Sequence, residues 1–206
     1  MPRRDGGGHG ARRRGNYGTL FDHFGLVAPL YDRVIRAPEV DRLSQLARLQ
    51  PDDTVLDVGG GTGRVAERIL DQVRAVLVLD VSEGMLRQAV AKGGLTPCIA
   101  VVEAMPFGDG AFSRILAVDS FHHFGDQAVA ARELTRVLAP GGTLVIEEPD
   151  IRRLSVKLVA LGERVALMRS RFRLPHELVP MFSSGTTSVT VHESAPNYWI
   201  VVHKRL

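Results

Sequence analysis

The sequence contains a single cysteine, Cys98, in 206 residues, and it has no long hydrophobic run. One cysteine cannot form a disulfide within the chain, and Cys98 lacks the spaced partners of a zinc site. No segment approaches the roughly 18–20 consecutive apolar residues of a membrane-spanning helix. No apolar stretch follows the N-terminal arginines, as it would in a secretory signal. We therefore expect a cytoplasmic protein without a disulfide framework, a metal site or a membrane anchor.

Aromatic residues are also few, at 6% of the chain, while hydrophobic residues make up 45% and charged residues 24%. These values and the chain length are typical of one globular domain. The net charge of +3 is unevenly distributed, because residues 1–18 combine five arginines and six glycines with a single aspartate. Such a segment cannot form a hydrophobic core. We expect a disordered basic arm over residues 1–18 and a single domain over residues 19–206.

From residue 54 onward, apolar segments typical of strands alternate with amphipathic segments typical of helices. The expected strands are residues 54–58, 75–79, 97–102, 114–118 and 143–148, and the expected helices are residues 40–49, 63–71, 85–91 and 127–138. Strands that are apolar throughout and alternate with helices indicate a parallel sheet covered on both faces. Residues 188–192 and 198–203 alternate in polarity around a turn, which predicts an antiparallel hairpin.

A glycine-rich turn follows the first expected strand, where residues 57–63 read DVGGGTG. Glycines let the backbone approach a ligand closely, and the N-terminus of the next helix offers unpaired N–H groups. Residues 61–66 also fit the dinucleotide fingerprint, with Asp80 near the required distance, so an NAD(P)-dependent oxidoreductase is one interpretation. Against it, Asp57 at the end of the strand would repel a pyrophosphate. A carboxylate there suits a ligand with an ammonium or sulfonium charge.

Asp57, Gly59, Gly61 and Gly63 are the residues at which the sequence resembles the class I S-adenosylmethionine-dependent methyltransferases. Residues 103–112 (EAMPFGDGAF) and 138–144 (LAPGGTL) resemble two further stretches of the family pattern. The resemblance implies an α/β fold with a Rossmann-like, seven-stranded, doubly wound sheet, mostly parallel with an antiparallel C-terminal strand. It also implies S-adenosylmethionine as the cofactor. Within the class, the chain resembles the ubiquinone/menaquinone-biosynthesis-type (methyltransferase type 11) small-molecule methyltransferases, which methylate carbon of a prenylated ring.

The resemblance assigns roles around the cofactor. Asp57 and the glycines would hold its methionine portion, Asp80 would bind the ribose hydroxyls, and Met85 would cover one face of the adenine. Glu103 and Ala104 would contact the adenine edge. The expected cofactor-binding set is Asp57, Gly59, Gly60, Gly61, Gly63, Asp80, Val81, Met85, Glu103, Ala104 and Asp119.

The fourth expected strand is followed by residues 119–124, which read DSFHHF and lie at the same edge of the sheet. A histidine there could take a proton from a hydroxyl or an activated carbon near neutral pH, so His122 and His123 are candidate bases. Alternatively, one histidine packs in the core and the other hydrogen-bonds the following loop. The expected acceptor pocket consists of Tyr31, His122, His123, Met168 and Phe172, of which Tyr31 resembles part of the family's N-terminal lid. The strand lacks the Asn-Pro-Pro-Tyr-like sequence that follows it in enzymes methylating nucleic-acid amino groups.

Residues 151–172 form a basic amphipathic segment, within a stretch, 151–182, where the family builds its helical substrate cover. Such a helix either packs on its own domain or lies on an anionic membrane surface, so peripheral membrane contact is an open expectation. The basic arm could likewise bind nucleic acid or anionic lipid, or simply be solvated. A methyltransferase-like module that mainly binds nucleic acid or membrane is therefore the alternative to an enzyme acting on a small molecule. We expect the small-molecule acceptor, and the sequence does not indicate an oligomeric state.

Overall fold

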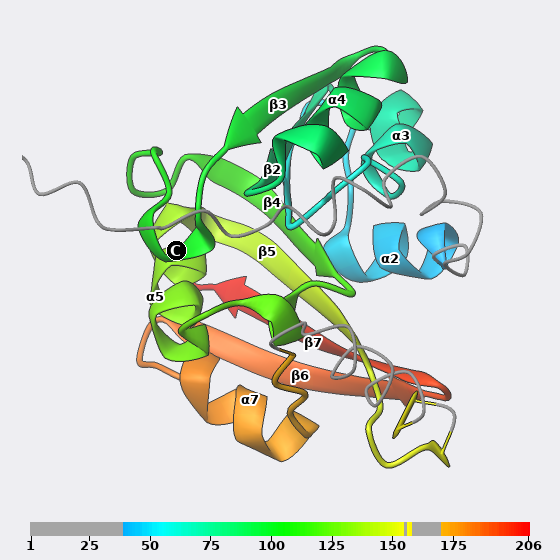
Figure 1. Cartoon of the computed structure of the whole chain (residues 1–206). Helices are drawn as coiled ribbons and strands as arrows, with labels where there is room; N and C mark the ends of the chain where they lie inside the picture. Colours follow the sequence, from blue (N-terminus) through cyan, green and yellow to red (C-terminus); the bar gives the residue numbers. More distant parts are fainter. Residues whose placement is uncertain (1–38, 155, 158–169) are drawn as a thin grey trace, which may run out of the picture.

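The computed structural model describes residues 39–154, 156–157 and 170–206 of the chain (Figure 1). The strands are β1 (Thr54–Val58), β2 (Ala75–Asp80), β3 (Leu95–Ile99), β4 (Phe112–Val118), β5 (Leu138–Pro149), β6 (Thr187–Ser194) and β7 (Asn197–Lys204). The α-helices are α2 (Val40–Ala47), α3 (Ala66–Ile69), α4 (Glu83–Ala91), α5 (Gln127–Val137) and α7 (Pro175–Phe182). Short 3-10 helices are η1 (Leu70–Gln72), η2 (Val102–Ala104) and η3 (Phe121–His123). The expected basic arm, Tyr31, Met168 and most of the segment 151–172 lie outside the described residues.

The strands form one sheet in the order β3-β2-β1-β4-β5-β7-β6. Neighbouring strands from β3 to β5 run parallel, and β7 runs antiparallel to both of its neighbours, β5 and β6. This confirms the expected seven-stranded, doubly wound, mostly parallel sheet with an antiparallel C-terminal strand. The strand order reverses between β1 and β4, and open sheets of this kind form a ligand-binding crevice at the carboxyl ends of such strands.

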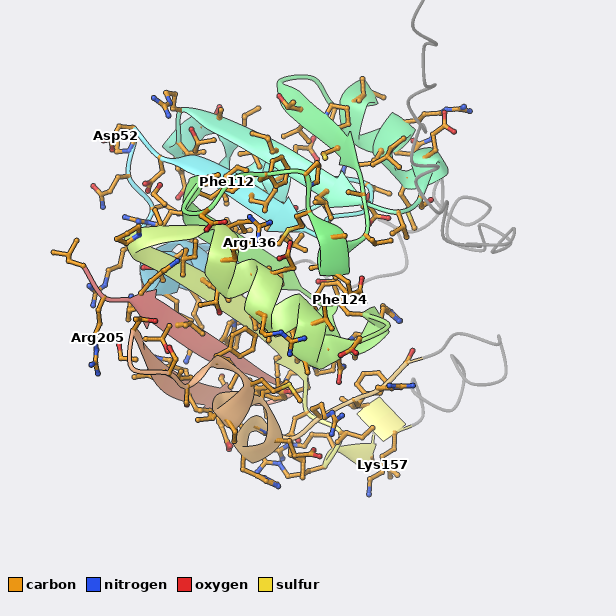
Figure 2. All side chains as sticks on the ribbon, turned by 90° about the vertical axis from the view of Figure 1, so that its left-hand side faces the viewer. Asp52, Phe112, Phe124, Arg136, Lys157 and Arg205 are labelled. Carbon is orange, nitrogen blue, oxygen red and sulfur yellow. The ribbon has the colours of Figure 1, made fainter. Side chains whose placement is uncertain are left out.

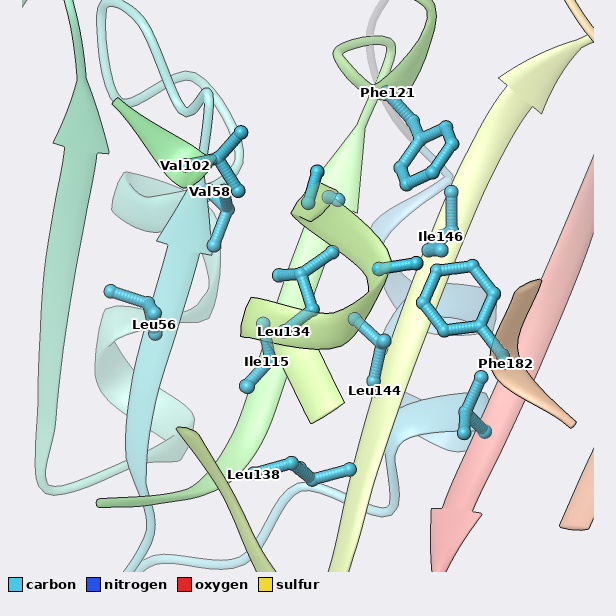
Figure 3. Close-up of a cluster of buried hydrophobic side chains, with 14 of the residues drawn as sticks. Leu56, Val58, Val102, Ile115, Phe121, Leu134, Leu138, Leu144, Ile146 and Phe182 are labelled. Atoms are coloured by element: carbon cyan, nitrogen blue, oxygen red, sulfur yellow. The ribbon is translucent and has the colours of Figure 1, made fainter. Parts of the chain in front are cut away.

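A hydrophobic core on each face of the sheet holds the helices in place. One core packs α5 and α7 against the sheet and includes Leu134 and Phe182 (Figure 3). The other core packs α2, α3 and α4 against the opposite face and includes Leu43 and Trp199. Burying a leucine or phenylalanine side chain contributes roughly 1.5–3 kcal/mol. Both faces therefore select apolar residues, which explains why the central strands are largely apolar.

β3 covers Leu95–Ile99 instead of the expected residues 97–102, and the chain then turns into η2. The difference arises from Pro97, which was expected to begin the strand but lies in its middle, opposite Val78 of β2. β3 is an edge strand of the sheet. One side of an edge strand needs no ladder hydrogen bonds, so it tolerates a proline.

β5 begins at Leu138 instead of Thr143, and residues 139–142, where a turn before the strand was expected, form an irregular stretch within it. Phe112 of β4 is opposite Leu138, whereas Arg114 is opposite Thr143, so the register shifts between these pairs. Bulges bend a strand and increase its twist. α5 already ends at Val137, so the Pro-Gly-Gly sequence shapes only the start of β5.

The described residues were also compared with the requirements of a membrane-spanning helix and of a metal site. In that part of the chain, no helix combines the length and apolar character needed to cross a membrane. The same residues bring together no group of three or more His, Cys, Asp or Glu side chains suited to a metal ion.

Candidate functional site

The glycine-rich turn lies between the carboxyl ends of β1, β2 and β4. The N–H of Gly59 donates to the carbonyl oxygen of Leu79 in β2 at 2.7 Å. Gly59 has a φ of +67°, and a Cβ atom there would lie 2.6 Å from the Cβ atom of Ser120, just past β4. Gly63 has a φ of +73°, and a Cβ atom there would lie 2.7 Å from Leu95. Only glycine satisfies both the left-handed backbone and the close contact, so the turn keeps its backbone against the strand ends.

Asp57 is the most unusual carboxylate of this crevice. It is 1% exposed, and neither of its carboxylate oxygens accepts a hydrogen bond of normal geometry from the part of the chain that the structure describes. Burial raises its pKa to about 7, although the positive charge of Arg64 opposes this rise. Gly60 lies directly over the carboxylate, because a Cβ atom there would be 2.5 Å from Oδ2. A buried carboxylate without a partner is unfavourable until a cation or a hydrogen-bond donor reaches it.

Asp80 ends β2, and the backbone beside the glycine turn holds its side chain. Its Oδ2 accepts a hydrogen bond from the N–H of Gly61 at 2.9 Å, and its Oδ1 accepts one from Ser82 at 2.8 Å. A carboxylate oxygen can accept more than one hydrogen bond, so Asp80 retains capacity for a hydroxyl. The adjacent Val81 is 63% exposed, whereas Met85 is 2% exposed and lies in the core next to Gly61. The expected cofactor contact of Val81 and the expected adenine contact of Met85 stay predictions.

Glu103 and Ala104 lie in η2, in a loop that α5 holds in position. Oε1 of Glu103 accepts a hydrogen bond from the N–H of Asp126 at 3.0 Å, and Ala104 is exposed. Arg136 of α5 donates to the carbonyl oxygens of Met105 and Phe107 at 3.3 and 2.8 Å (Figure 2). The predicted adenine-binding loop is therefore positioned by an arginine that sequence reasoning did not single out.

Asp119 lies directly after β4 in a left-handed conformation, with a φ of +51°. Its Oδ2 accepts a hydrogen bond from Nη2 of Arg64 at 3.0 Å, and the Arg64 side chain is 10% exposed. Burial raises the pKa of Asp119, and Arg64 lowers it. The ion pair joins the glycine turn to the end of β4. Arg64 was missed as a site residue, and its one signal is its position next to Gly63 in an otherwise apolar stretch.

His122 is held by Glu148 at the end of β5. Nδ1 of His122 lies 2.7 Å from Oε2 of Glu148, and the two side chains are 3% and 2% exposed. Oε1 of Glu148 accepts a hydrogen bond from the N–H of Phe121 at 2.9 Å. Phe172 stacks on the His122 ring at 4.3 Å between centroids. Glu148 was not expected in the site, because it is 26 residues from His122 in the sequence.

His123 lies beside His122, with 4.0 Å between the ring centroids. Its Nδ1 is 3.2 Å from Oγ of Ser170. Burial lowers the pKa of His123 to about 3, and the charge of His122 acts in the same direction. His123 is therefore neutral near pH 7. Of the expected acceptor pocket, the structure brings together His122, His123 and Phe172, and their roles stay predictions.

The comparison with protein families finds a match to a methyltransferase domain over residues 56–146. Among curated proteins, the ubiquinone/menaquinone biosynthesis C-methyltransferase UbiE of Cupriavidus necator is 30% identical over 72% of this chain and 69% of that protein. The sarcosine/dimethylglycine N-methyltransferase of Halorhodospira halochloris is 36% identical over 62% of this chain, and the 23S rRNA (guanine(748)-N(1))-methyltransferase of Streptomyces fradiae is 32% identical over 76%. The chain spans only 50% and 56% of these last two proteins.

Among solved structures, a methyltransferase described in complex with the Haloferax volcanii Trm112 activator has a TM-score of 0.79 at 17% identity. The match covers 91% of this chain and 100% of that chain, and at this identity it shows the fold. The names of these curated relatives all describe methyl transfer, but to different acceptors. The first acts in ubiquinone/menaquinone biosynthesis, the second on sarcosine and dimethylglycine, and the third on a guanine of 23S rRNA.

Proposed function

Because the chain belongs to the class I S-adenosylmethionine-dependent methyltransferases of the UbiE type, we propose that it methylates carbon in the hydroxylated ring of a prenylated quinone precursor. The UbiE relative, with 69% of its length matched, supports this acceptor over the amine and rRNA acceptors of relatives that are matched over about half of their length. One observation carries the donor side of the reaction. This is the buried carboxylate of Asp57, which has no hydrogen-bond partner in the described part of the chain.

The residues of the crevice fit S-adenosylmethionine, which supplies an electrophilic methyl group on a sulfonium sulfur. Asp57 would accept hydrogen bonds from the ammonium group of the methionine portion, and so lose the penalty of its unpaired burial. Asp80 would accept the ribose hydroxyls, since its position is already set by two backbone N–H groups. The exposed Ala104 would contact the adenine edge, as the resemblance implies.

On the acceptor side, aromatic side chains gather near the two histidines. Phe121 and Phe124 meet edge to face at 5.3 Å, and Phe172 stacks on His122. Such surfaces suit a ring substrate, because aromatic rings favour stacked and edge contacts. This arrangement supports the ring acceptor.

Peripheral membrane contact through residues 151–172 is part of the proposal, because a prenylated acceptor would partition into a bilayer. Only residues 151–154, 156–157 and 170–172 of this segment are described. Leu154 is 73% exposed, which supports contact with an apolar surface. Arg152 pairs with Asp150 and Glu193 at 2.8 and 3.0 Å, so its charge is partly neutralised. The expected liposome binding is therefore weak, and should decrease with salt.

The test is a screen of acceptors with isotopically labelled S-adenosylmethionine, read by mass spectrometry. It should include a prenylated 1,4-naphthohydroquinone, sarcosine and a guanine-containing RNA hairpin. The expected result is one methyl group on a ring carbon of the hydroquinone. Methylation of sarcosine or of the RNA, with an unmodified hydroquinone, would contradict the proposed acceptor.

The other hypotheses receive less support. The NAD(P)-dependent oxidoreductase conflicts with Asp57 in the crevice and with the methyltransferase matches, and tight binding of NADH in calorimetry would revive it. The alternative of a nucleic-acid- or membrane-binding module depends on residues 1–18, which lie outside the described residues. Deleting residues 1–18 should leave methyl transfer intact if the chain is the enzyme proposed here.

A further inference from the structure

Glu147 in β5 is a buried carboxylate that the cofactor contacts above leave unused. It is 2% exposed, and its Oε1 accepts a hydrogen bond from Nδ2 of Asn197 at 2.6 Å. Its Oε2 accepts no hydrogen bond of normal geometry from a described residue. Buried polar atoms in folded proteins are nearly always paired. An unpaired oxygen therefore marks a place where a further polar group binds.

Trp199 provides a second unpaired polar atom at the same place. It is fully buried, lies opposite Glu147 in the pairing of β5 with β7, and its Nε1–H has no acceptor of normal geometry among the described residues. The N–H is near enough to Glu147 to lower the pKa of its carboxyl group, but its geometry is too poor for a hydrogen bond. The two polar atoms thus lie side by side without a well-formed hydrogen bond between them. A hydroxyl and an oxygen of one ligand would satisfy both.

Glu147 shares a face of the sheet with Asp57. Side chains two residues apart in a strand point to the same face, and Val55 and Val145 both belong to the core that packs α2, α3 and α4. The pairing places Asp57 opposite Leu116, and Glu147 opposite Val118 of the same strand, β4. Two strand spacings and two residue steps correspond to roughly 12 Å between the Cα atoms of Asp57 and Glu147. A methyl donor held at Asp57 and an acceptor held at Glu147 fit within this span.

Contacts through Asp119 connect Glu147 to the glycine turn. The N–H of Asp119 donates to the carbonyl oxygen of Glu147 at 3.0 Å, and the Asp119 carboxylate pairs with Arg64, which follows Gly63. On the other side, the guanidinium group of Arg42 stacks over Trp199 at 4.4 Å. Arg42 and Glu39 also line a recess of about 430 Å³ at the start of α2. Arg42 thus contacts Trp199 and also lines this recess, whereas Glu147 and Trp199 themselves are buried beside it.

Within the described residues, charged and polar groups from three places act on Glu147. Burial and the negative charge of Asp119 raise its pKa to about 7, with a smaller contribution from Glu39 before α2. Asn197 and Trp199 of β7 lower the pKa, and the positive charge of Arg42 is stacked on the Trp199 ring. A carboxyl group with this pKa accepts a proton near neutral pH and releases it again to water.

We propose that Glu147 is the catalytic proton acceptor of the methyl-transfer reaction, with Oε2 bound to a hydroxyl group of the acceptor ring and Trp199 Nε1–H donating to a ring oxygen. Asn197 is a positioning residue that fixes the other oxygen of Glu147. The inference rests on the proposed function, because it requires a hydroxylated ring. His122 and His123 are the competing candidates, and the experiments below separate them from Glu147.

In the step that follows, the hydroxyl proton moves from the ring oxygen to Oε2 of the ionised Glu147. An electron pair of the ring carbon forms the bond to the methyl group, and the sulfur–methyl bond breaks with its electrons remaining on sulfur. The displaced proton of that ring carbon returns to the ring oxygen. The products are the methylated ring, a neutral thioether and a protonated Glu147, which then releases its proton to water.

The kinetic test uses the full chain, S-adenosylmethionine and 2-prenyl-1,4-naphthohydroquinone. In the wild-type enzyme, kcat/KM should fall as the pH decreases through about 7, because protonated Glu147 cannot accept a proton. Glu147→Gln should lower kcat by about 100-fold or more and remove this dependence, with unchanged binding of S-adenosylmethionine in calorimetry. Glu193→Gln, at an exposed position in β6, is the matched control and should behave as wild type. A normal kcat in Glu147→Gln, or loss of the pH dependence in His122→Gln instead, overturns the proposal.

Asn197→Ala is the second variant, in case Glu147→Gln does not fold. The hydrogen bond from Asn197 lowers the pKa of Glu147, so its loss should move the pH dependence of kcat/KM to higher pH. A merely structural role of Asn197 would change the amount of folded protein, measured by circular dichroism, but leave the pH dependence in place. An unmoved pH dependence in a folded Asn197→Ala variant therefore contradicts the role of Glu147.

Fluorescence tests Glu147 without turnover, because Trp199 is the single tryptophan of the chain. A protonated carboxyl group quenches indole emission more than a carboxylate does, so the emission should titrate with a midpoint near pH 7 in the wild type and not in Glu147→Gln. If the wild type does not methylate the hydroquinone, the proposed acceptor is wrong. This titration then still shows whether Glu147 ionises near pH 7 beside Trp199. A titration that is identical in Glu147→Gln overturns the inference.

Discussion

The proposed ligand-binding edge of the sheet has a cofactor end, at β1 and β2, and an acceptor end, at β4, β5 and β7. The two ends are built in different ways. At the cofactor end, residues 57–63 and Asp80 are close in sequence, and backbone N–H groups hold the Asp80 carboxylate. At the acceptor end, side chains far apart in the sequence hold one another, as in the contacts of Glu148 with His122 and of Glu147 with Asn197. The cofactor end therefore follows from a local motif, whereas the acceptor end depends on how distant segments meet.

Asp57→Asn tests the cofactor end most strongly. Asp57 has a folded-state pKa near 7, above its ordinary value of 3.8, so its ionisation opposes folding. This cost is absent below pH 3.8 and fully present above about pH 7. Asp57→Asn should therefore raise the free energy of unfolding by up to about 4 kcal/mol at pH 8, with little change at pH 4. Urea unfolding at the two pH values measures this, and equal effects at both would contradict the unpaired state of Asp57.

The same variant should bind S-adenosylmethionine more weakly although it is more stable. The loss of a charged hydrogen-bond acceptor costs about 1.5–3 kcal/mol, or about 10- to 100-fold in affinity. Isothermal calorimetry of the wild type and the variant at pH 8 provides the measurement. Greater stability with unchanged affinity would separate Asp57 from the cofactor.

At the acceptor end, the test is the stability of a His123 variant at acid pH. The unfolded chain binds a proton at His123 below about pH 6.5, whereas the folded protein binds it only near pH 3. The folded state therefore loses stability as the pH falls from about 6.5 toward 3, by a few kcal/mol in all. His123→Gln should reduce this loss, which thermal unfolding at pH 4.5 and pH 7.5 would reveal. A variant with wild-type acid sensitivity would show that His123 is protonated more easily than its burial indicates.

Asp80→Ala has an intermediate expected effect at the cofactor end. It should weaken binding of S-adenosylmethionine by about 1–3 kcal/mol, since a charged acceptor for hydroxyl groups is lost. Because Asp80 also holds Gly61 and Ser82, Asp80→Asn is the matched variant that retains part of the hydrogen bonding. Unchanged affinity in both variants would remove the ribose assignment.

Arg136→Lys has the smallest expected effect. Arg136 holds the loop of Glu103 and Ala104, but its side chain is 31% exposed, so the network contributes modestly. Lysine keeps the charge and loses the forked geometry. We expect a loss of about 1 kcal/mol in stability and a few-fold weaker cofactor binding. A change in cofactor affinity as large as that of Asp80→Ala would show that this loop contributes more to adenine binding than proposed.

The sequence predicted the fold well where patterns are local. The alternation of strands and helices and the C-terminal hairpin are confirmed, and the glycine turn lies at the predicted edge. The prediction from the sequence failed where contacts with distant segments decide the local structure. Pro97 lies inside β3 because that strand forms the sheet edge, and residues 139–142 form an irregular stretch of β5 because β4 continues beside them.

The proposed site residues, too, could be predicted only where they belong to a local sequence pattern. Asp57 and Asp80 could be found from their distance to the glycines, whereas Arg64, Arg136, Glu147 and Glu148 could not. A buried charged residue in a strand gives no local sign of its partner, which for Glu147 is 50 residues away. The sequence also could not show that His122 is paired with a carboxylate while its neighbour His123 is not protonated near pH 7.

The amino-acid sequence alone determined the α/β class, the position of the glycine turn and the acidic residues expected at the cofactor, because these depend on spacing within a few tens of residues. Only the tertiary structure decided which carboxylates are unpaired and which titrate near neutral pH. Burial and the distance to other charges set a pKa. Both are properties of the packed sheet, where Asp57 and Glu147 lie on one face with β4 between their strands.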